Sequence, residues 1–143
     1  MKKVIALCFG IFLLAPLSAQ HYTLSPAESE LRWTGYAAFS TYALNGRMEA
    51  KSGALSIQEE TLHHGTLVMD MRTLASDEYR KLTKHLKSAD FFDVANYPTA
   101  GFTLTGPARL EASFVKGRLQ IKGTEREELV PLEIERRDER IIL

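Results

Sequence analysis

Hydrophobic and polar positions alternate along most of the chain after residue 20, which predicts β-strands with one apolar and one polar face. In residues 31–35, Leu31 and Trp33 fall on one side and Arg32 and Thr34 on the other. The same alternation recurs in five further runs, centred on Leu55, Met69, Phe102, Leu119 and Leu132. Short strands at this spacing predict an antiparallel sandwich or barrel.

Dipeptides that are typical of turns separate these runs. They are Ser25-Pro26, Asn45-Gly46, His64-Gly65, Gly106-Pro107 and Gly123-Thr124. Pro131 lies inside a strand-like run and cannot donate a ladder hydrogen bond, so we expect an edge strand or a bulge at that position.

One segment departs from the strand period and predicts a single helix at about residues 76–88. Apolar residues recur there at helical spacing, at Tyr79, Leu82, Leu86 and Ala89. Ser76 is a suitable N-cap, and Asp77 and Glu78 would follow in the first turn, where acidic side chains suit the helix dipole. We therefore expect one helix of about three turns, inserted between two strands.

Residues 1–19 have the layout of a secretory signal peptide. Lys2 and Lys3 precede an apolar run, and small residues follow it before a predicted cut after Ala19. The alternative is an uncleaved membrane anchor, but the apolar run is shorter than the roughly 20 residues that a membrane span needs. We therefore expect one mature domain, residues 20–143, with a periplasmic or secreted location and no stable membrane insertion after cleavage.

Removal of the signal peptide changes the charge and the cysteine content. The 18 basic residues become 16 against 18 acidic ones, a formal net charge of −2, which offers no electrostatic footprint for nucleic acid. The single cysteine, Cys8, is removed as well, so no disulfide is expected. No metal-ligand set or cofactor motif stands out, and we expect neither a metal nor a cofactor.

A central block of sequence resembles the YceI-like family of periplasmic lipid-binding proteins. It reads "HLKSADFFDVANYPTAGF", is preceded by "MDMRTLASD", and is followed by "GRLQIKGTEREELVPLEI". The segment "LNGRMEAKSGAL" agrees with the family's second strand, and the resemblance spans residues 22–135. It implies an antiparallel lipocalin-like β-barrel with a helix at its mouth, which binds a polyisoprenoid or similar chain in an apolar tunnel.

The chain departs from the family pattern in two places. Many relatives carry a histidine where Tyr36 or Ala37 stands here. A contact between that histidine and a ligand head group is therefore not available in this chain. Relatives also continue for further strands beyond the position of Leu143. Either the barrel closes with fewer strands, or it is incomplete at its C-terminal end. In the second case an apolar open edge of Ile141, Ile142 and Leu143 would let two copies pair as a homodimer.

The inward apolar series, the helix and the turn after it predict the lining of a binding site for an isoprenoid or fatty-acyl amphiphile. The candidate residues are Trp33, Leu55, Met69, Met71, Leu82, Leu86, Phe91, Phe92, Phe102 and Leu119. Phe91 and Phe92 are adjacent in a turn and point in different directions, so we expect one to enter the barrel mouth and the other to pack under the helix. Methionine side chains suit a lining that accepts varied chains.

His85, Asp90 and Asp93 are the candidates for a different function, a hydrolase or an isomerase. No nucleophile, oxyanion donor or second histidine at ligand spacing accompanies them, so we favour a binding protein over an enzyme or a metal site. We expect His85 to meet carbonyls at the helix end and Asp90 to cap the next turn. A third hypothesis is a packed structural barrel without a ligand, acting through a protein partner at its open edge.

Overall fold

A computed structural model of the protein describes residues 18–36, 42–137 and 140–142. The predicted signal peptide therefore lies almost entirely outside the described residues, as do Ala37 and Leu143. The elements in chain order are β1 Gln20–Thr23, the 3-10 helix η1 Pro26–Glu28, β2 Leu31–Tyr36, β3 Ala43–Gln58, β4 Thr61–Ser76, α1 Arg80–Lys87, β5 Thr99–Leu104, β6 Ala108–Arg109, β7 Phe114–Ile121, β8 Thr124–Pro131, β9 Glu135–Arg137 and β10 Arg140–Ile142.

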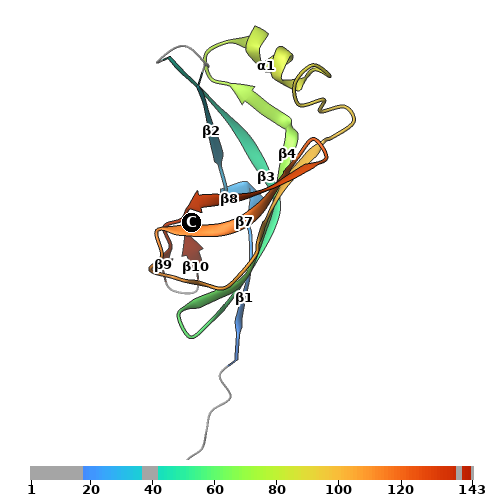
Figure 1. The fold of residues 1–143 in the computed structure, drawn as a ribbon. Coiled ribbons are helices and arrows are strands. Elements are labelled where there is room, and N and C mark those ends of the chain that lie inside the picture. Colours follow the sequence, from blue (N-terminus) through green and yellow to red (C-terminus); the bar gives the residue numbers. More distant parts are fainter. Residues whose placement is uncertain (1–17, 37–41, 138–139, 143) are drawn as a thin grey trace, which may run out of the picture.

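Eight antiparallel strands form one sheet, and α1 lies beyond one end of its long strands (Figure 1). The strand order is β1-β3-β4-β5-β7-β8, with β2 also paired to β3 and β6 to β4, while β9 and β10 form a separate two-stranded sheet. Within the described ranges, β8 pairs only with β7. The mostly β, antiparallel class with one inserted helix is thus confirmed, and the sheet is open where a complete barrel would close.

The long hairpin of β3 and β4 lies in the interior of the sheet, between β1 and β5 (Figure 1). Its turn is Glu59-Glu60, where both residues have positive φ angles, 48° and 58°. Positive φ at both central residues is the turn geometry that matches the twist of a two-residue hairpin. Register shifts interrupt the pairing of β3 with β4 at three places, and such bulges bend and twist a sheet.

Two of the predicted turns lie inside strands. Asn45-Gly46 belongs to β3, and His64-Gly65 belongs to β4. Gly46 pairs with Trp33 of β2, and Gly65 pairs with Leu55 of β3. In both places the glycine leaves space for a large side chain on the neighbouring strand, which is another common reason for glycine within a strand.

The other turn predictions agree with the structure, with a small shift at the last hairpin. Ser25-Pro26 leads into η1, and Gly106-Pro107 lies between β5 and β6. The β7–β8 turn consists of Lys122 and Gly123, with φ angles of 48° and 71°, and Thr124 is the first residue of β8. Pro131 ends β8, an edge strand within the described part of the chain, as expected.

Helix α1 is shorter than predicted and begins at Arg80. Ser76 is the last residue of β4, and its hydroxyl accepts hydrogen bonds from the backbone N–H groups of Glu78 and Tyr79, both at 3.3 Å. It therefore holds the turn before the helix, and Asp77 forms an ion pair with Arg47 at 3.1 Å instead of entering the first helical turn. The result is two helical turns where the sequence pattern predicts three.

The best-buried apolar cluster lies between α1 and the sheet. It consists of Met71, Leu74, Leu86, Val94 and Ala100, which come from β4, α1, the following loop and β5. Trp33, Met48, Met69, Leu82, Phe92 and Ile121 pack against it. We call these five buried residues the helix cluster. Among the described residues, no helix is long and apolar enough to cross a bilayer.

Candidate functional site

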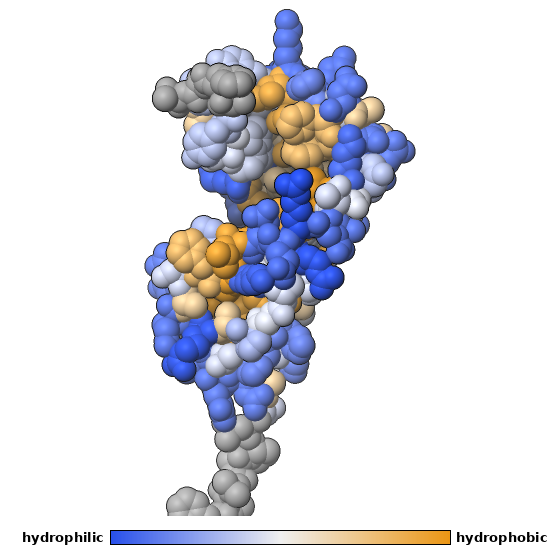
Figure 2. All heavy atoms as spheres, viewed as in Figure 1, coloured by the Kyte–Doolittle hydropathy of each residue, from blue (hydrophilic) through white to orange (hydrophobic). Residues whose placement is uncertain are grey.

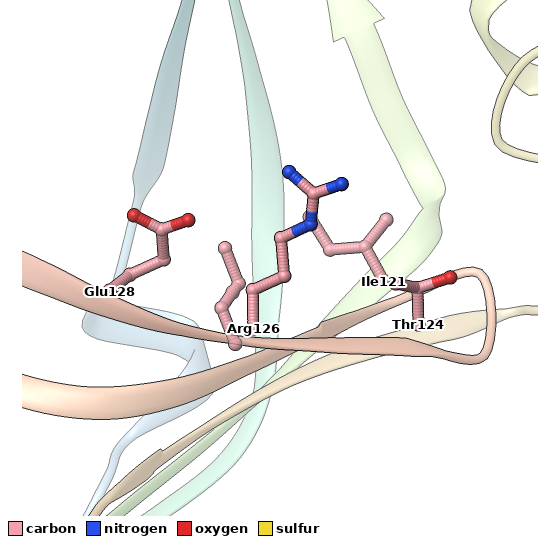
Figure 3. Close-up of a pocket in the computed structure, with 5 residues that line it drawn as sticks. Ile121, Thr124, Arg126 and Glu128 are labelled. Atoms are coloured by element: carbon pink, nitrogen blue, oxygen red, sulfur yellow. The ribbon is translucent and has the colours of Figure 1, made fainter.

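A pocket of about 390 Å³ lies on one face of the β7–β8 hairpin. It is lined by Leu119 and Ile121 from β7 and by Thr124, Arg126 and Glu128 from β8. Leu119 pairs with Arg126 and Ile121 with Thr124, and directly opposed residues in an antiparallel pair share a face. Figure 3 shows Ile121, Arg126 and Glu128 rising from the same side of the hairpin.

The pocket adjoins the helix cluster through Ile121, which lines the pocket and also packs against the cluster. Figure 2 shows hydrophobic surface in the part of the molecule that contains α1, a second hydrophobic patch below it, and a band of hydrophilic side chains between them. The pocket therefore offers charged groups on β8 next to Leu119 and Ile121, and Ile121 links it to the partly buried apolar residues around the helix cluster. This combination suits an amphiphile better than a wholly apolar molecule.

Most of the predicted lining residues gather around the helix cluster. Met71 and Leu86 belong to it, and Trp33, Met69, Leu82 and Phe92 pack against it. Leu119 lies in the pocket itself. The structure thus brings seven of the ten predicted residues to the helix cluster or to the adjoining pocket.

The three remaining predicted residues belong neither to the helix cluster nor to the residues that line the pocket. Leu55 lies beside Gly65, close to Leu62 and Leu104, and so belongs to another apolar region of the sheet. Phe102 is the cross-strand partner of Leu119, and its ring covers Gly117, where an added methyl group would collide with it. Phe91 is 45% exposed on the loop after α1.

Phe91 and Phe92 do point in different directions. Their ring centroids are 4.6 Å apart and the rings are nearly perpendicular, a favourable edge-to-face arrangement. Phe92 packs against the helix cluster, whereas Phe91 faces the surface and its ring centroid lies 5.9 Å from that of His85. Phe91 is therefore accessible to a ligand that approaches the loop.

Lys122 connects this loop to the β7–β8 hairpin. Its ammonium group donates hydrogen bonds to the carbonyl oxygens of Ala89 at 2.9 Å and Phe91 at 2.8 Å. The loop that carries the two phenylalanines is thereby fixed to the strand pair that lines the pocket. Charge-assisted hydrogen bonds of this kind are stronger than neutral ones.

We predict that Lys122→Met loosens the loop without unfolding the protein. Amide hydrogens of residues 89–93 should exchange several-fold faster when measured by hydrogen–deuterium exchange, because the rate rises exponentially with the hydrogen-bond energy that is lost. The matched control is Lys116→Met on the same hairpin, because Lys116 pairs with Glu127 and not with the loop. Equal exchange of the loop in the two variants would show that Lys122 does not hold it.

The candidate catalytic residues are not brought together by direct contacts. Within the described residues, no hydrogen bond or ion pair joins His85 to Asp90 or Asp93, and no group of three potential metal ligands occurs. The Asp93 carboxylate accepts hydrogen bonds from the Asn96 side-chain amide at 2.9 and 3.1 Å, which stabilises the local turn.

Ser88 organises the end of the helix, where the sequence suggested His85 and Asp90. The Ser88 hydroxyl donates to the His85 carbonyl at 2.7 Å, and its carbonyl accepts from the backbone N–H groups of Phe91 and Asp93. The His85 and Asp90 side chains are both exposed. Asp90 therefore does not cap this turn.

Trp33 brings a polar group to the helix cluster. Its ring lies over Gly46, and the indole nitrogen is buried without a hydrogen-bond partner in the described part of the chain. Buried donors usually find a partner, and one that does not reduces stability.

Arg126 and Glu128 are pocket residues that the sequence analysis missed. They belong to the charged run of residues 125–128, which resembles a solvated outer face of the last hairpin. A strand turns alternate side chains to opposite faces, so four consecutive charged residues in a strand must place two of them on each face. That periodicity is the signal that could have identified them.

Comparison with known proteins identifies the family of this chain. A family model described as the YceI-like domain matches residues 22–141. The chain belongs to the YceI-like family. The match begins in β1 and ends in β10, so this YceI-like domain includes the helix cluster and the pocket.

The structure comparison finds the crystal structure of Burkholderia cenocepacia BcnA. That protein is 15% identical to this YceI-like chain, with a TM-score of 0.45, and the match covers 83% of this chain and 69% of BcnA. No curated protein sequence matches this chain.

Proposed function

We propose that this YceI-like protein is an exported binding protein that holds a long-chain amphiphile, either an isoprenoid or a fatty-acyl compound. The observation that carries the proposal is the position of Ile121, which joins the pocket of β7 and β8 to the helix cluster. A chain that enters the pocket can therefore extend past Ile121 toward the partly buried apolar residues around the cluster. Membership of a family associated with hydrophobic ligands supports the same function.

The size of the site suits this class of ligand. Ligand pockets commonly measure about 300–1,000 Å³, and the volume here is about 390 Å³. Each buried methylene contributes about 0.8 kcal/mol, so roughly ten methylenes supply about 8 kcal/mol. Association costs at least about 4 kcal/mol, so the chain must bury most of its length to bind usefully. Contact with the pocket alone is not enough, and the partly buried apolar residues around the helix cluster, such as Met69 and Leu82, provide the additional surface.

The proposal includes cleavage of residues 1–19 and action in the periplasm, where YceI-like proteins generally function. It assigns no catalytic step to His85, Asp90 or Asp93. The outer edge of β8 has no partner strand within the described residues, and it is the place where a second copy would add to the sheet.

Native mass spectrometry and thermal unfolding test the proposed function. Protein purified from an exporting host should carry a copurified lipid, and added farnesol or palmitate should raise the melting temperature. Ligand at 100 times its Kd stabilises the folded state by about 2.7 kcal/mol, which corresponds to a rise of roughly 5 °C or more for a domain of this size.

Two leucine variants make the thermal test specific for the pocket. Leu119→Asn places a polar group in the pocket and should reduce the ligand-induced rise, whereas Leu129→Asn, on the opposite face, should leave it unchanged. Each variant is compared with its own ligand-free form. Absence of copurified lipid together with no ligand-induced rise in the parent protein would refute the proposed function.

A further inference from the structure

The two faces of β8 differ in how their charges are satisfied. On the outer face, Glu127 pairs with Lys116 at 2.9 Å and Glu125 with Arg118 at 3.6 Å. On the pocket face, Arg126 and Glu128 form no ion pair or hydrogen bond with each other or with any other described residue. Every acidic side chain of the outer face has a basic partner, and the pocket face lacks this complementarity.

The neighbours of the pocket-face charges explain the lack of partners. Arg126 stands opposite Leu119, and Glu128 stands opposite Gly117, which has no side chain. Both charged groups are exposed and rise into the space above the hairpin (Figure 3). One positive and one negative group thus stand beside each other at the entrance to apolar surface.

We propose that Arg126 and Glu128 recognise a zwitterionic head group on the bound amphiphile, with its anionic group at Arg126 and its ammonium group at Glu128. The inference rests on the proposed function, because Leu119, Ile121 and the apolar residues beyond them must hold the chain. The guanidinium group donates two parallel hydrogen bonds to a phosphate, and a carboxylate accepts from an ammonium. A phosphoethanolamine head carries both groups on a two-carbon link.

Coulomb's law favours a zwitterionic head group over an anionic or a neutral one at this pair of charges. Residues two apart in a strand are separated by about 7 Å, and interaction energy falls as the inverse of distance. An anionic group about 4 Å from Arg126 therefore loses roughly half of its attraction to repulsion by Glu128. A neutral head gains from neither charge, whereas a zwitterion gains from both.

The experiment compares three lipids that share one acyl chain and differ only in the head. Lysophosphatidylethanolamine is zwitterionic, lysophosphatidylglycerol is anionic and monoacylglycerol is neutral. Titration calorimetry below the critical micelle concentration should show the zwitterionic lipid binding about tenfold more tightly than either of the others. Free phosphoethanolamine should bind far more weakly than its lipid, because the chain supplies most of the affinity.

Three glutamine variants assign the selectivity to the pair. Arg126→Gln should remove the preference for either phospholipid, and Glu128→Gln should make the anionic lipid bind at least as tightly as the zwitterionic one. Glu127→Gln, on the outer face, should leave the selectivity of the parent protein unchanged. All three side chains are exposed, so the variants should retain the parental melting temperature to within a few degrees.

The outcomes separate this inference from the proposed function. If all three lipids bind with Kd values within twofold of one another, Arg126 and Glu128 do not discriminate between head groups. The proposed binding function then stands without this inference. If Glu127→Gln alters selectivity as much as Glu128→Gln, the inference is wrong as well. If free phosphoethanolamine binds as tightly as its lipid, the site is not one for a lipid head. If none of the three lipids binds, the inference about the head group is wrong, and the test with farnesol and palmitate then decides the proposed function separately.

Discussion

Replacement of Gly46 by alanine is expected to lower the free energy of unfolding by about 3 kcal/mol, the upper end of the usual cost of overpacking, because one of the clashes is with the backbone. A Cβ atom at Gly46 would collide with the backbone carbonyl oxygen of Ala75 and with the ring of Trp33. A carbonyl oxygen within a paired strand cannot rotate away as a side chain does. Relief requires β3 to separate from β4, or the indole to leave the helix cluster. Urea unfolding, followed by far-ultraviolet circular dichroism, measures the change.

Gly101→Ala is the matched control for this substitution. Gly101 is also a strand glycine, and a Cβ atom there would meet only the Leu67 carbonyl oxygen at 3.8 Å, an ordinary contact. Alanine loses less conformational entropy than glycine on folding, so this variant should be neutral or slightly more stable. If the two variants unfolded at the same urea concentration, the close approach of Trp33 and Ala75 to Gly46 would be refuted.

Gly46 also shows why the sequence pattern predicted a turn where the structure has a strand. The dipeptide Asn45-Gly46 has a strong local preference for hairpin turns. The reason for this glycine is not local, because Trp33 belongs to another strand and reaches Gly46 only through the pairing of β2 with β3. A pattern read along one segment contains no information about that register. The actual turn at Glu59-Glu60 carries neither glycine nor asparagine, and it therefore gave no signal.

The helix begins later in the chain than the sequence pattern predicts, for a related reason. Serine is a preferred N-cap residue, and the Ser76 hydroxyl does accept two backbone hydrogen bonds. The pairing of β4 with β3 nevertheless includes Ser76, since Gly46 stands opposite it. Strand pairing therefore extends to the residue at which local propensity would begin a helix, and the helix starts only at Arg80. Tertiary context overrides propensity in this way where two elements compete for one residue.

The apolar side of the candidate site was more accessible to sequence reasoning than its polar side. Burial with period two identified Trp33, Met69 and Met71 as inward-facing, and all three contact or belong to the helix cluster. The same rule, applied to the charged run in β8, would have placed Arg126 and Glu128 on the pocket face. Alternation predicts which face a residue occupies. It does not predict which part of a curved sheet that face will meet, so Leu55 and Phe102 could not be distinguished from the residues under the helix.

Leu74→Ala is expected to cost about 2–5 kcal/mol, the usual range for removing a buried leucine side chain. Leu74 is 1% exposed and lies in the helix cluster, which contains residues of α1, β4, β5 and the loop between them. A helix of two turns is too short to be stable alone, so its position depends on this packing. The variant should therefore also show faster amide exchange in residues 82–87, and its ligand-induced rise in melting temperature should be smaller.

Leu129→Ala makes the same chemical change on the surface of β8, where the leucine is 68% exposed, and it should alter the free energy of unfolding by no more than about 0.5 kcal/mol. The difference between the two variants isolates burial from the intrinsic cost of replacing leucine by alanine in a strand. If Leu74→Ala weakened the fold but left amide exchange in α1 unchanged, the helix would be held by contacts other than the cluster. The Lys87 ammonium, which donates to the Arg72 carbonyl oxygen at 2.6 Å, would then be the attachment to remove next.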